Sequence, residues 1–312
     1  MKLFAGRSNP ELAREISAEL DMPLGRLTIK NFNDGEIYVK FEENIRNEDV
    51  FIIQSTNPPA DNIIELLLML DAARRASAGT VTAVIPYYGY ARQDRKDKPR
   101  VPISARLFLD TFEAVGAGRI ITMDLHSPQI QGFVNIPFDH LYSRLVLLER
   151  LKKLNLTADN GVVLSPDMGS ARMGQAYARY LDVGFALIDK RRPAHNRAEV
   201  VHMVGHLKDR HVIIIDDMID TAGTLLSASQ SAMEHGAKSI TAVATHGLFS
   251  EPARQSLLSA PIDKIIVTNT ITIDPRELNS KLEIISVAKV FAASIERITA
   301  GQSLSSLFEM EV

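Results

Sequence analysis

The strongest constraint on the fold of this chain is a regular alternation of short apolar segments with longer amphipathic ones. The short segments are continuously apolar, which is typical of strands buried on both faces of a parallel sheet. The longer segments have the length and spacing of helices, and the first has Pro10 at its first helical position. This alternation predicts doubly wound α/β domains. We expect strands at residues 49–55, 80–88, 119–126, 161–167, 211–217, 239–246 and 264–270, and helices at 10–20, 61–77, 102–115, 141–154, 170–181, 224–235 and 287–300.

The length of the chain and a sequence similarity between its two halves predict two similar domains. At about 150 residues per domain, 312 residues correspond to two. AVGAGRIITMDLHS (114–127) and EHGAKSITAVATHG (234–247) share a helix end, Gly-Ala, a strand and a His ten residues after the Gly, and SAGTVTAVIPYYG (77–89) has a similar Gly-then-strand shape. We therefore predict α/β domains with mostly parallel sheets at 1–145 and 146–312, related by internal duplication.

Composition excludes several classes of protein. The chain has no cysteine, so disulfides, thiolate zinc sites, iron–sulfur clusters and a cysteine nucleophile are excluded. The net charge of −3 provides no general attraction to nucleic acid or anionic lipid. The N-terminus turns polar within five residues, and the longest apolar run, IIELLLML, has the length of a core helix rather than of a membrane span. We expect a soluble, cytoplasmic protein without membrane or nucleic-acid partners.

The segment with the clearest chemical meaning is HVIIIDDMIDTAGT (211–224), where an apolar strand ends in two carboxylates. Ligands of open α/β sheets bind at the carboxyl ends of the strands. Gly, hydroxyls and the first N–H groups of a helix suit a phosphate monoester, whereas carboxylates suit sugar hydroxyls or Mg²⁺. Such a loop describes a ribose 5-phosphate site, and a capped turn with surface acids is the alternative. Its candidate residues are Asp216, Asp217, Asp220, Thr221, Gly223 and Thr224.

Other polar segments also follow predicted strands, and each has a plain structural alternative. Basic residues and three tyrosines at 87–100 suit a nucleotide or a solvated loop. His126 is a phosphate or metal candidate or a structural histidine, and Asp167 is a ligand candidate or a helix cap. Residues 189–200 predict a mobile loop, either a cationic lid or a linker. Residues 32–41 predict a turn and an alternating strand. Neither a Walker A loop nor GxGxxG occurs, so nucleotide binding by those motifs is excluded.

Together these segments resemble the ribose-phosphate diphosphokinases, which make phosphoribosyl diphosphate (PRPP) from ATP and ribose 5-phosphate. The resemblance covers essentially the whole chain, through FNDGEIYV, YARQDRKDKPR, DLHSPQIQGF, SPDMG, DKRRP, DDMIDTAGT, ATHGLFS and SLSSLF. It implies a phosphoribosyltransferase-like fold and transfer of the β,γ-diphosphoryl group of ATP to the 1-hydroxyl of ribose 5-phosphate, with AMP as the other product and Mg²⁺ as cofactor. PRPP then serves nucleotide, histidine and tryptophan synthesis.

The resemblance assigns a role to each matching position. The N-terminal domain would carry the nucleotide segments, and the C-terminal domain the catalytic and ribose loops. A general base is not identified; Asp216 or Asp217 suits holding ribose hydroxyls better than proton abstraction. The implied residues are Phe32, Asp34, Glu36, Arg92, Gln93, Asp97 and His126 for ATP; His126 and Asp167 for the metal; Lys190 and Arg192 for catalysis; and Asp216, Asp217, Asp220, Thr221, Ala222, Gly223 and Thr224 for ribose 5-phosphate.

The resemblance also implies a homo-oligomer, expected to be a hexamer, with an effector site for phosphate or ADP. In the family the loop matching 32–36 completes a neighbouring subunit's site, and the C-terminal tail joins basic residues of another subunit. The effector residues here would be Arg46, Arg100, Ser303, Ser305 and Phe308. The chain departs from the family pattern at Asn44, Ser127, Pro128, Ser170 and Met173, and Ala222 stands at a variable position.

Three competing functions remain open at this point. A phosphoribosyltransferase would use the same ribose loop, but it would need one such domain and would leave FNDGEIYV and DKRRP unexplained. A catalytically silent regulatory homologue is disfavoured because the implied metal and lid residues are all present. A PRPP-sensing transcription regulator is disfavoured because the chain has no added helix-turn-helix segment or basic domain.

Overall fold

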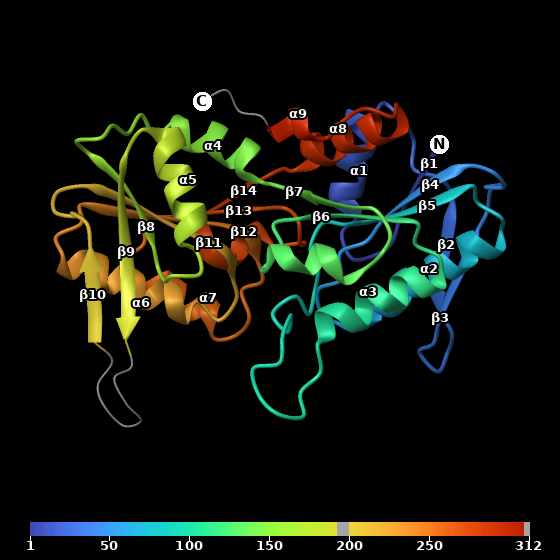
Figure 1. Ribbon diagram of the computed structural model, residues 1–312, viewed down its shortest axis with the longest axis horizontal. Helices are drawn as coiled ribbons and strands as arrows, with labels where there is room; N and C mark the ends of the chain where they lie inside the picture. Colours follow the sequence, from blue (N-terminus) through green and yellow to red (C-terminus); the bar gives the residue numbers. More distant parts are fainter. Residues whose placement is uncertain (192–199, 309–312) are drawn as a thin grey trace. The chain divides into compact units, whose positions relative to one another are not determined.

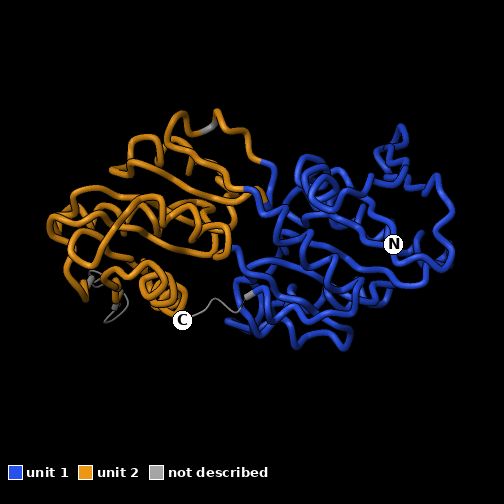
Figure 2. Tube along the Cα trace, turned by 90° about the horizontal axis from the view of Figure 1, so that it is seen from above, with its two compact units in different colours: residues 1–143, 270–272, 286–310 blue, residues 144–269, 273–285, 311–312 orange. Residues whose placement is uncertain are grey.

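The computed structural model describes residues 1–191 and 200–308 (Figure 1). The chain divides into two compact units (Figure 2). Unit 1 contains Met1–Ser143, Thr270–Thr272 and the chain from Ser286 onward, and unit 2 contains Arg144–Asn269 and Ile273–Ile285. The predicted boundary at 145/146 lies two residues from the observed change. The prediction that the whole of 146–312 forms the second domain is wrong, because the described chain from Ser286 onward packs with unit 1.

Unit 1 is built on a five-stranded parallel sheet in the order β1-β4-β5-β6-β7. Leu24 forms a parallel bridge with Leu3 on the edge of β1 away from β4. After β1 the chain therefore passes first along one side of this strand, at Leu24, and then forms β4 on its other side. This reversal places a topological switch point between β1 and β4. The strands are β1 (Lys2–Ala5), β4 (Asp49–Ile53), β5 (Thr80–Ile85), β6 (Arg119–Met123) and β7 (Phe138–Leu141).

Helices cover both faces of this sheet (Figure 1). On one face α1 (Pro10–Glu19) packs with α8 (Ala288–Thr299), and α9 (Ser305–Phe308) follows. On the other face α2 (Asp61–Arg75) packs with α3 (Ser104–Val115). Ser286 at the start of the returning segment donates to Glu15 of α1, which helps to explain why α8 belongs to unit 1. A 3₁₀-helix spans Pro128–Phe133.

A separate antiparallel hairpin packs against the core of unit 1. It consists of β2 (Leu27–Asn31) and β3 (Ile37–Phe41). Because side chains alternate along a strand, Leu27, Ile29, Val39 and Phe41 share one face, and all four pack against the core. The hairpin and its turn at 32–36 confirm the expectation for FNDGEIYVKF.

Unit 2 is a seven-stranded sheet in the order β10-β9-β8-β11-β12-β13-β14, parallel except at β10. The chain runs from β8 to β9 on one side and then returns to β11 on the other, which places the switch point between β8 and β11. The strands are β8 (Gly161–Ser165), β9 (Gly184–Arg191), β10 (Val200–Val204), β11 (His211–Ile219), β12 (Ser239–Gly247), β13 (Lys264–Thr268) and β14 (Leu282–Ile285), and the helices are α4 (Arg144–Lys152), α5 (Ala171–Leu181), α6 (Gly223–Glu234), α7 (Ala253–Ser259) and the 3₁₀-helix Pro275–Lys281.

The two switch points confirm the doubly wound fold class and support internal duplication. Counted from the switch point, the counterpart of β12 is β5, whereas β6 corresponds to β13. The shared spacing of 114–127 and 234–247 therefore joins strands that are not equivalent, and the weaker match at 77–89 marks the equivalent position.

All seven predicted strands and seven predicted helices are present to within a few residues. Of the segment 189–200, predicted to be a mobile loop, residues 189–191 and 200 belong to strands, because the main-chain pairing of β9 with β10 continues to Arg191 opposite Val200, and residues 192–199 lie outside the described residues. β11 extends two residues beyond its predicted end. Within the described chain, no helix is long and apolar enough to cross a bilayer.

Candidate functional site

Three carboxylates gather at the switch point of unit 2. Asp216 lies on β11, and Asp167 follows β8, the adjacent parallel strand, in which Leu164 pairs with Ile214. Burial is the largest cause that raises the pKa of Asp216 to about 8, and the carboxylates of Asp217 and Asp167 raise it further. Adjacent strand order thus brings together residues that are about 50 positions apart in the sequence.

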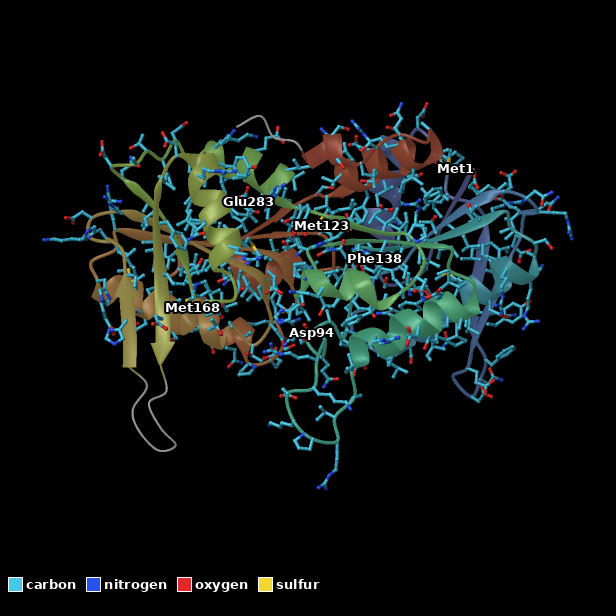
Figure 3. The ribbon with its side chains drawn as sticks, in the orientation of Figure 1. Met1, Asp94, Met123, Phe138, Met168 and Glu283 are labelled. Atoms are coloured by element: carbon cyan, nitrogen blue, oxygen red, sulfur yellow. The ribbon has the colours of Figure 1, made fainter. Side chains whose placement is uncertain are left out.

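The loop after β8 holds Asp167 in place. Its Oδ1 accepts from the N–H groups of Gly169 and Ser170 at 2.8 and 3.1 Å, just before α5. The capping alternative therefore describes part of what Asp167 does. It does not describe all of it, because the same carboxylate also acts electrostatically on Asp216. Met168, labelled in Figure 3, is 64% exposed beside it.

The ribose-loop candidates join β11 to α6. β11 ends at Ile219, Ala222 adopts a left-handed φ of 62°, and α6 begins at Gly223. A Cβ added at Gly223 would meet no atom within 4 Å, so the space beside it is open. The first turn of a helix presents N–H groups without intrahelical acceptors, which suits a phosphate. Asp220 and Thr224 flank this turn.

One of the two catalytic candidates lies on β9, the neighbour of β8 on the side away from β11. Lys190 belongs to β9, where its main chain pairs with Val201, and Arg192 lies outside the described residues.

The nucleotide candidates of unit 1 follow β5. Gln93 is anchored to the start of α3: its side chain accepts from the Ser104 hydroxyl, and its carbonyl accepts from Ala105 N–H at 3.2 Å. Tyr88 is buried, which raises its pKa, and it donates to the Ala105 carbonyl at 2.6 Å. Arg92 and Asp97 are exposed on the long segment that also contains Asp94 (Figure 3). One end of this segment is therefore fixed.

His126 lies at the end of the next strand, three residues after Met123, which Figure 3 labels at the end of β6. Its side chain is exposed. The turn before it is held by Asp124, whose carboxylate accepts from the Ser143 N–H and hydroxyl at 3.0 and 2.5 Å. Leu125 N–H donates to His140 Nε2 at 2.9 Å. His126 thus lies on a turn at the carboxyl edge of the sheet, and hydrogen bonds from Ser143 to Asp124 and from Leu125 to His140 hold this turn in place.

The candidates Phe32, Asp34 and Glu36 occupy the tip of the β2–β3 hairpin. Asp34 Oδ1 accepts from Glu36 N–H at 3.1 Å, and Gly35 has a φ of +98° that favours glycine. Phe32 is 50% exposed and meets Tyr38 edge to face at 5.7 Å between ring centroids.

The effector candidates Arg46, Arg100, Ser303 and Ser305 are exposed, and Ser305 N–H donates to Ser303 Oγ at 3.2 Å. Arg46 N–H donates to Asn44 Oδ1, the position that departs from the family pattern. Arg100 has a left-handed φ of 66°. Ser303 and Ser305 lie at the start of α9, where the Ser303 carbonyl accepts from Arg297. Phe308 is the last residue of α9.

The metal candidates His126 and Asp167 belong to unit 1 and unit 2 respectively. Among the described residues, no group of three or more His, Cys, Asp or Glu side chains could hold a metal ion by itself.

Sequence reasoning also missed functional candidates around Glu65. The one signal was an acid inside the apolar run IIELLLML.

Comparisons with known proteins agree with this fold. Residues 1–116 match the N-terminal domain of ribose phosphate pyrophosphokinase, and residues 190–309 match the phosphoribosyl synthetase-associated domain. The chain is 50% identical to a ribose-phosphate pyrophosphokinase of Chlorobaculum tepidum, covering 99% of this chain and 95% of that protein. It is 47% identical to one of Aquifex aeolicus, covering 99% of each. The crystal structure of phosphoribosylpyrophosphate synthetase from Mycobacterium smegmatis superposes with a TM-score of 0.90 at 40% identity, over 96% of this chain and 99% of that one.

Fold, site and comparisons agree on one class. Two doubly wound α/β units, together with similarity over nearly the whole chain to ribose-phosphate pyrophosphokinases, identify the class as phosphoribosyl synthetase. The chain belongs to the ribose-phosphate pyrophosphokinase family.

Proposed function

We propose that this chain transfers the diphosphoryl group of ATP to the 1-hydroxyl of ribose 5-phosphate, giving PRPP and AMP. One observation carries the proposal beyond family membership. In unit 2 the carboxylates of Asp216, Asp217 and Asp167 meet at the switch point, directly before the open start of α6 at Gly223. One strand end thus offers acceptors for ribose hydroxyls and donors for a phosphate.

Unit 2 holds ribose 5-phosphate in this proposal. N–H groups at the start of α6 and the hydroxyls of Thr221 and Thr224 bind the 5-phosphate. Asp216 and Asp217 accept hydrogen bonds from the 2- and 3-hydroxyls. Asp220 and Ala222 shape the turn, and the left-handed φ of Ala222 turns the chain into the helix. The sugar is thereby oriented for attack, which is the main contribution a protein makes to such transfers.

Unit 1 holds ATP. Arg92, Gln93 and Asp97 contact the nucleotide, and His126 contacts its phosphates. The hairpin tip with Phe32, Asp34 and Glu36 contacts the adenine of a neighbouring subunit's ATP. Support comes from the anchoring of Gln93 at α3 and from the exposed ring of Phe32.

The carboxylate of Asp167 and the phosphates of ATP would supply the oxygen ligands that suit Mg²⁺ as cofactor. Mg²⁺ prefers oxygen ligands and keeps several waters, so it is usually bound by one or two carboxylates together with substrate phosphates. His126 and Asp167 would contribute to a complex completed by the triphosphate. Bound Mg²⁺ would offset the repulsion between two anionic substrates. Lys190 and Arg192 would stabilise the charge that develops on the transferred group.

The assembly, regulation and location of the enzyme are parts of the same proposal. We expect a homo-oligomer, a hexamer, because the hairpin tip would complete a neighbouring site. Phosphate and ADP would bind through Arg46, Arg100, Ser303, Ser305 and Phe308. The enzyme would act in the cytoplasm.

One assay tests the activity. The protein is incubated with ATP, ribose 5-phosphate and Mg²⁺, and the nucleotides and PRPP are quantified by chromatography. Equal amounts of AMP and PRPP are expected. Formation of ADP would contradict the proposal, and nucleotide binding without turnover would favour the silent homologue. Consumption of added PRPP with a free base would favour a phosphoribosyltransferase.

A further inference from the structure

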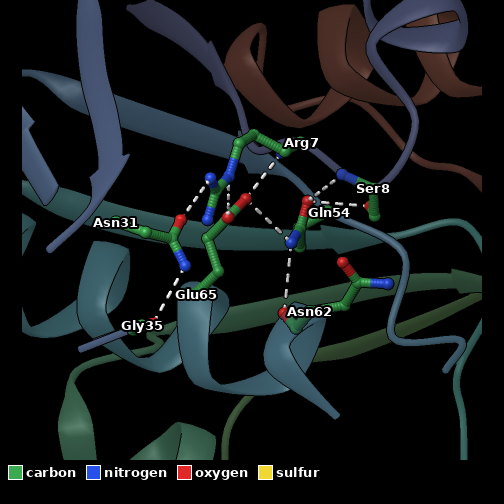
Figure 4. Close-up of polar contacts among 7 residues, drawn as sticks. All are labelled: Arg7, Ser8, Asn31, Gly35, Gln54, Asn62 and Glu65. Carbon is green, nitrogen blue, oxygen red and sulfur yellow. Dashed lines mark hydrogen bonds and ion pairs between the residues drawn. The ribbon is translucent and has the colours of Figure 1, made fainter. Parts of the chain in front are cut away.

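A buried polar network lies at the carboxyl edge of the unit 1 sheet (Figure 4). Gln54 and Glu65 are only 1% and 2% exposed. The Glu65 carboxylate accepts from the backbone N–H of Arg7 at 2.5 Å, from its Nε at 2.6 Å and from Gln54 Nε2 at 3.1 Å. Gln54 Oε1 in turn accepts from the N–H and hydroxyl of Ser8, at 3.1 and 2.8 Å, and Nε2 donates to the Asn62 carbonyl at 3.1 Å.

The network occupies the switch point between β1 and β4. This place corresponds to the edge of β8 and β11, which carries the acidic cluster in unit 2. Open α/β sheets bind ligands at such points. In unit 1, however, the chain's own side chains fill the space: a Cβ added at Gly6 would lie 2.2 Å from Gln54 Oε1 and 2.7 Å from Glu65 Oε1. The network therefore serves some purpose other than holding a ligand there.

The network extends outward to the hairpin tip. Arg7 Nη1 donates to Asn31 Oδ1 at 2.7 Å, and Asn31 Nδ2 donates to the Gly35 carbonyl at 2.9 Å. Asn31 is the last residue of β2, on the same face as Leu27 and Ile29. A continuous series of hydrogen bonds thus joins buried Glu65 to the loop at 32–36.

Each member of this series is held by the one before it. The buried Glu65 carboxylate would be an uncompensated charge without the Arg7 guanidinium, which is itself 45% exposed, so Arg7 is kept against Glu65. The guanidinium is planar and rigid, and its remaining nitrogens therefore point in a fixed direction. Asn31 is held by one of them and fixes the Gly35 carbonyl.

We propose that Arg7 and Asn31 are positioning residues that hold the hairpin tip in the conformation that binds the adenine of ATP. The inference rests on the proposed role of Phe32, Asp34 and Glu36. A tip ordered before binding loses less conformational entropy when ATP binds, so affinity for ATP and selectivity for its base both depend on it. In this proposal the switch point of unit 2 binds ribose 5-phosphate, whereas the switch point of unit 1 holds the loop at 32–36 in place through Arg7 and Asn31.

The first test measures steady-state kinetics of the full-length enzyme with Asn31→Ala. Losing an intramolecular hydrogen bond to a charged group typically lowers the population of the conformation it holds by about tenfold, and apparent affinity falls with that population. We therefore expect KM for ATP to rise about tenfold and kcat to change less than about twofold. KM for ribose 5-phosphate should stay at the parental value. The ratio of kcat/KM for ATP over GTP should fall about tenfold, because the tip reads the base.

A matched control changes the other end of the same strand. Thr28 donates to Glu42 Oε1 at 2.8 Å on the exposed face of β2. Thr28→Ala should leave both KM values and the ATP/GTP ratio at parental levels. If Asn31→Ala behaves like Thr28→Ala, or raises both KM values alike, the positioning role is refuted.

A second variant separates positioning from folding. Arg7→Met leaves Glu65 buried without a cation and should lower stability. Arg7→Met/Glu65→Gln removes both charges and keeps an oxygen that can accept from the backbone N–H at position 7 and from Gln54 Nε2. The double variant should unfold near the parental temperature and still show the raised KM for ATP. Adding Asn31→Ala to it should raise KM no further, because both changes break one series of bonds.

Variants of the hairpin tip itself distinguish two hypotheses: that the tip binds adenine, and that Arg7 and Asn31 position the tip. If Phe32→Ala and Asp34→Ala leave KM for ATP and the ATP/GTP ratio unchanged, the tip does not bind adenine. If those variants lose selectivity while Asn31→Ala and the Arg7 variants retain it, the tip binds adenine but is not positioned by this network.

Discussion

Replacing Asp216 by Asn should remove a pH-dependent cost to the stability of unit 2. The pKa of Asp216 is raised from an ordinary 3.8 to about 8 by burial and by the carboxylates of Asp217 and Asp167. Between these values the folded chain holds a proton that the unfolded chain has lost. Stability therefore falls as the pH rises through this window, and above it the penalty is constant. Asn has no proton to lose and carries no such dependence.

The size of the effect follows from the shift. One pKa unit corresponds to about 1.4 kcal/mol, so raising the pH from about 5.5 to about 8 costs the parental chain at most about 3 kcal/mol. Asp216 is partly reached by water, which reduces this to about 2 kcal/mol. For a unit of this size, about 2 kcal/mol shifts Tm by roughly 4–8 °C. The Tm of Asp216→Asn minus that of the parent should grow by this amount over the window.

Thermal unfolding of the ligand-free protein, at one protein concentration and constant ionic strength, measures that difference. Asp209→Asn removes an exposed carboxylate from the turn before β11 and controls for the loss of one charge. Asp217→Asn in the parental background should weaken the pH dependence, because it removes one cause of the raised pKa. A Tm difference for Asp216→Asn that is constant with pH would show that Asp216 ionises normally and that the carboxylates do not interact.

Four further outcomes are expected. Lys190→Ala and Arg192→Ala should each lower kcat by about 10²-fold with smaller changes in substrate affinity, and near-parental kcat in both would make the segment a linker. Asp217→Ala should weaken ribose 5-phosphate binding in calorimetry while ATP binding survives; equal losses for both ligands would assign the loop to the nucleotide. Arg46→Ala should blunt activation by phosphate or inhibition by ADP without altering the chemistry at saturating substrate, and unchanged regulation would remove support for the effector site. Light scattering should detect an oligomer, whereas an active monomer would refute a shared adenine site.

The sequence alone located the central strands and most of the helices, and it predicted the chemistry of single strand ends. Continuous apolar runs located the central strands, since parallel strands are buried on both faces. The run HVIIIDD and the DTAGT that follows two residues later predicted where a phosphorylated sugar would bind, because a strand end and a helix start adjoin in sequence. Loop 32–36 was visible for the same reason: Asn33, Asp34 and Gly35 are local turn signals.

Only the tertiary structure decided which of these ends meet and what supports them. Asp167 acts on Asp216 because β8 and β11 are neighbours, and strand order is not encoded in local periodicity. The return of α8 to unit 1 likewise depends on its packing with α1, far away in the sequence. The anchor of the hairpin tip was hidden for the same reason. In the sequence, Glu65 is a single acid in an apolar helix. The fold places Arg7, 58 residues earlier, against it, and a buried carboxylate needs such a partner because an unpaired buried charge is strongly destabilising.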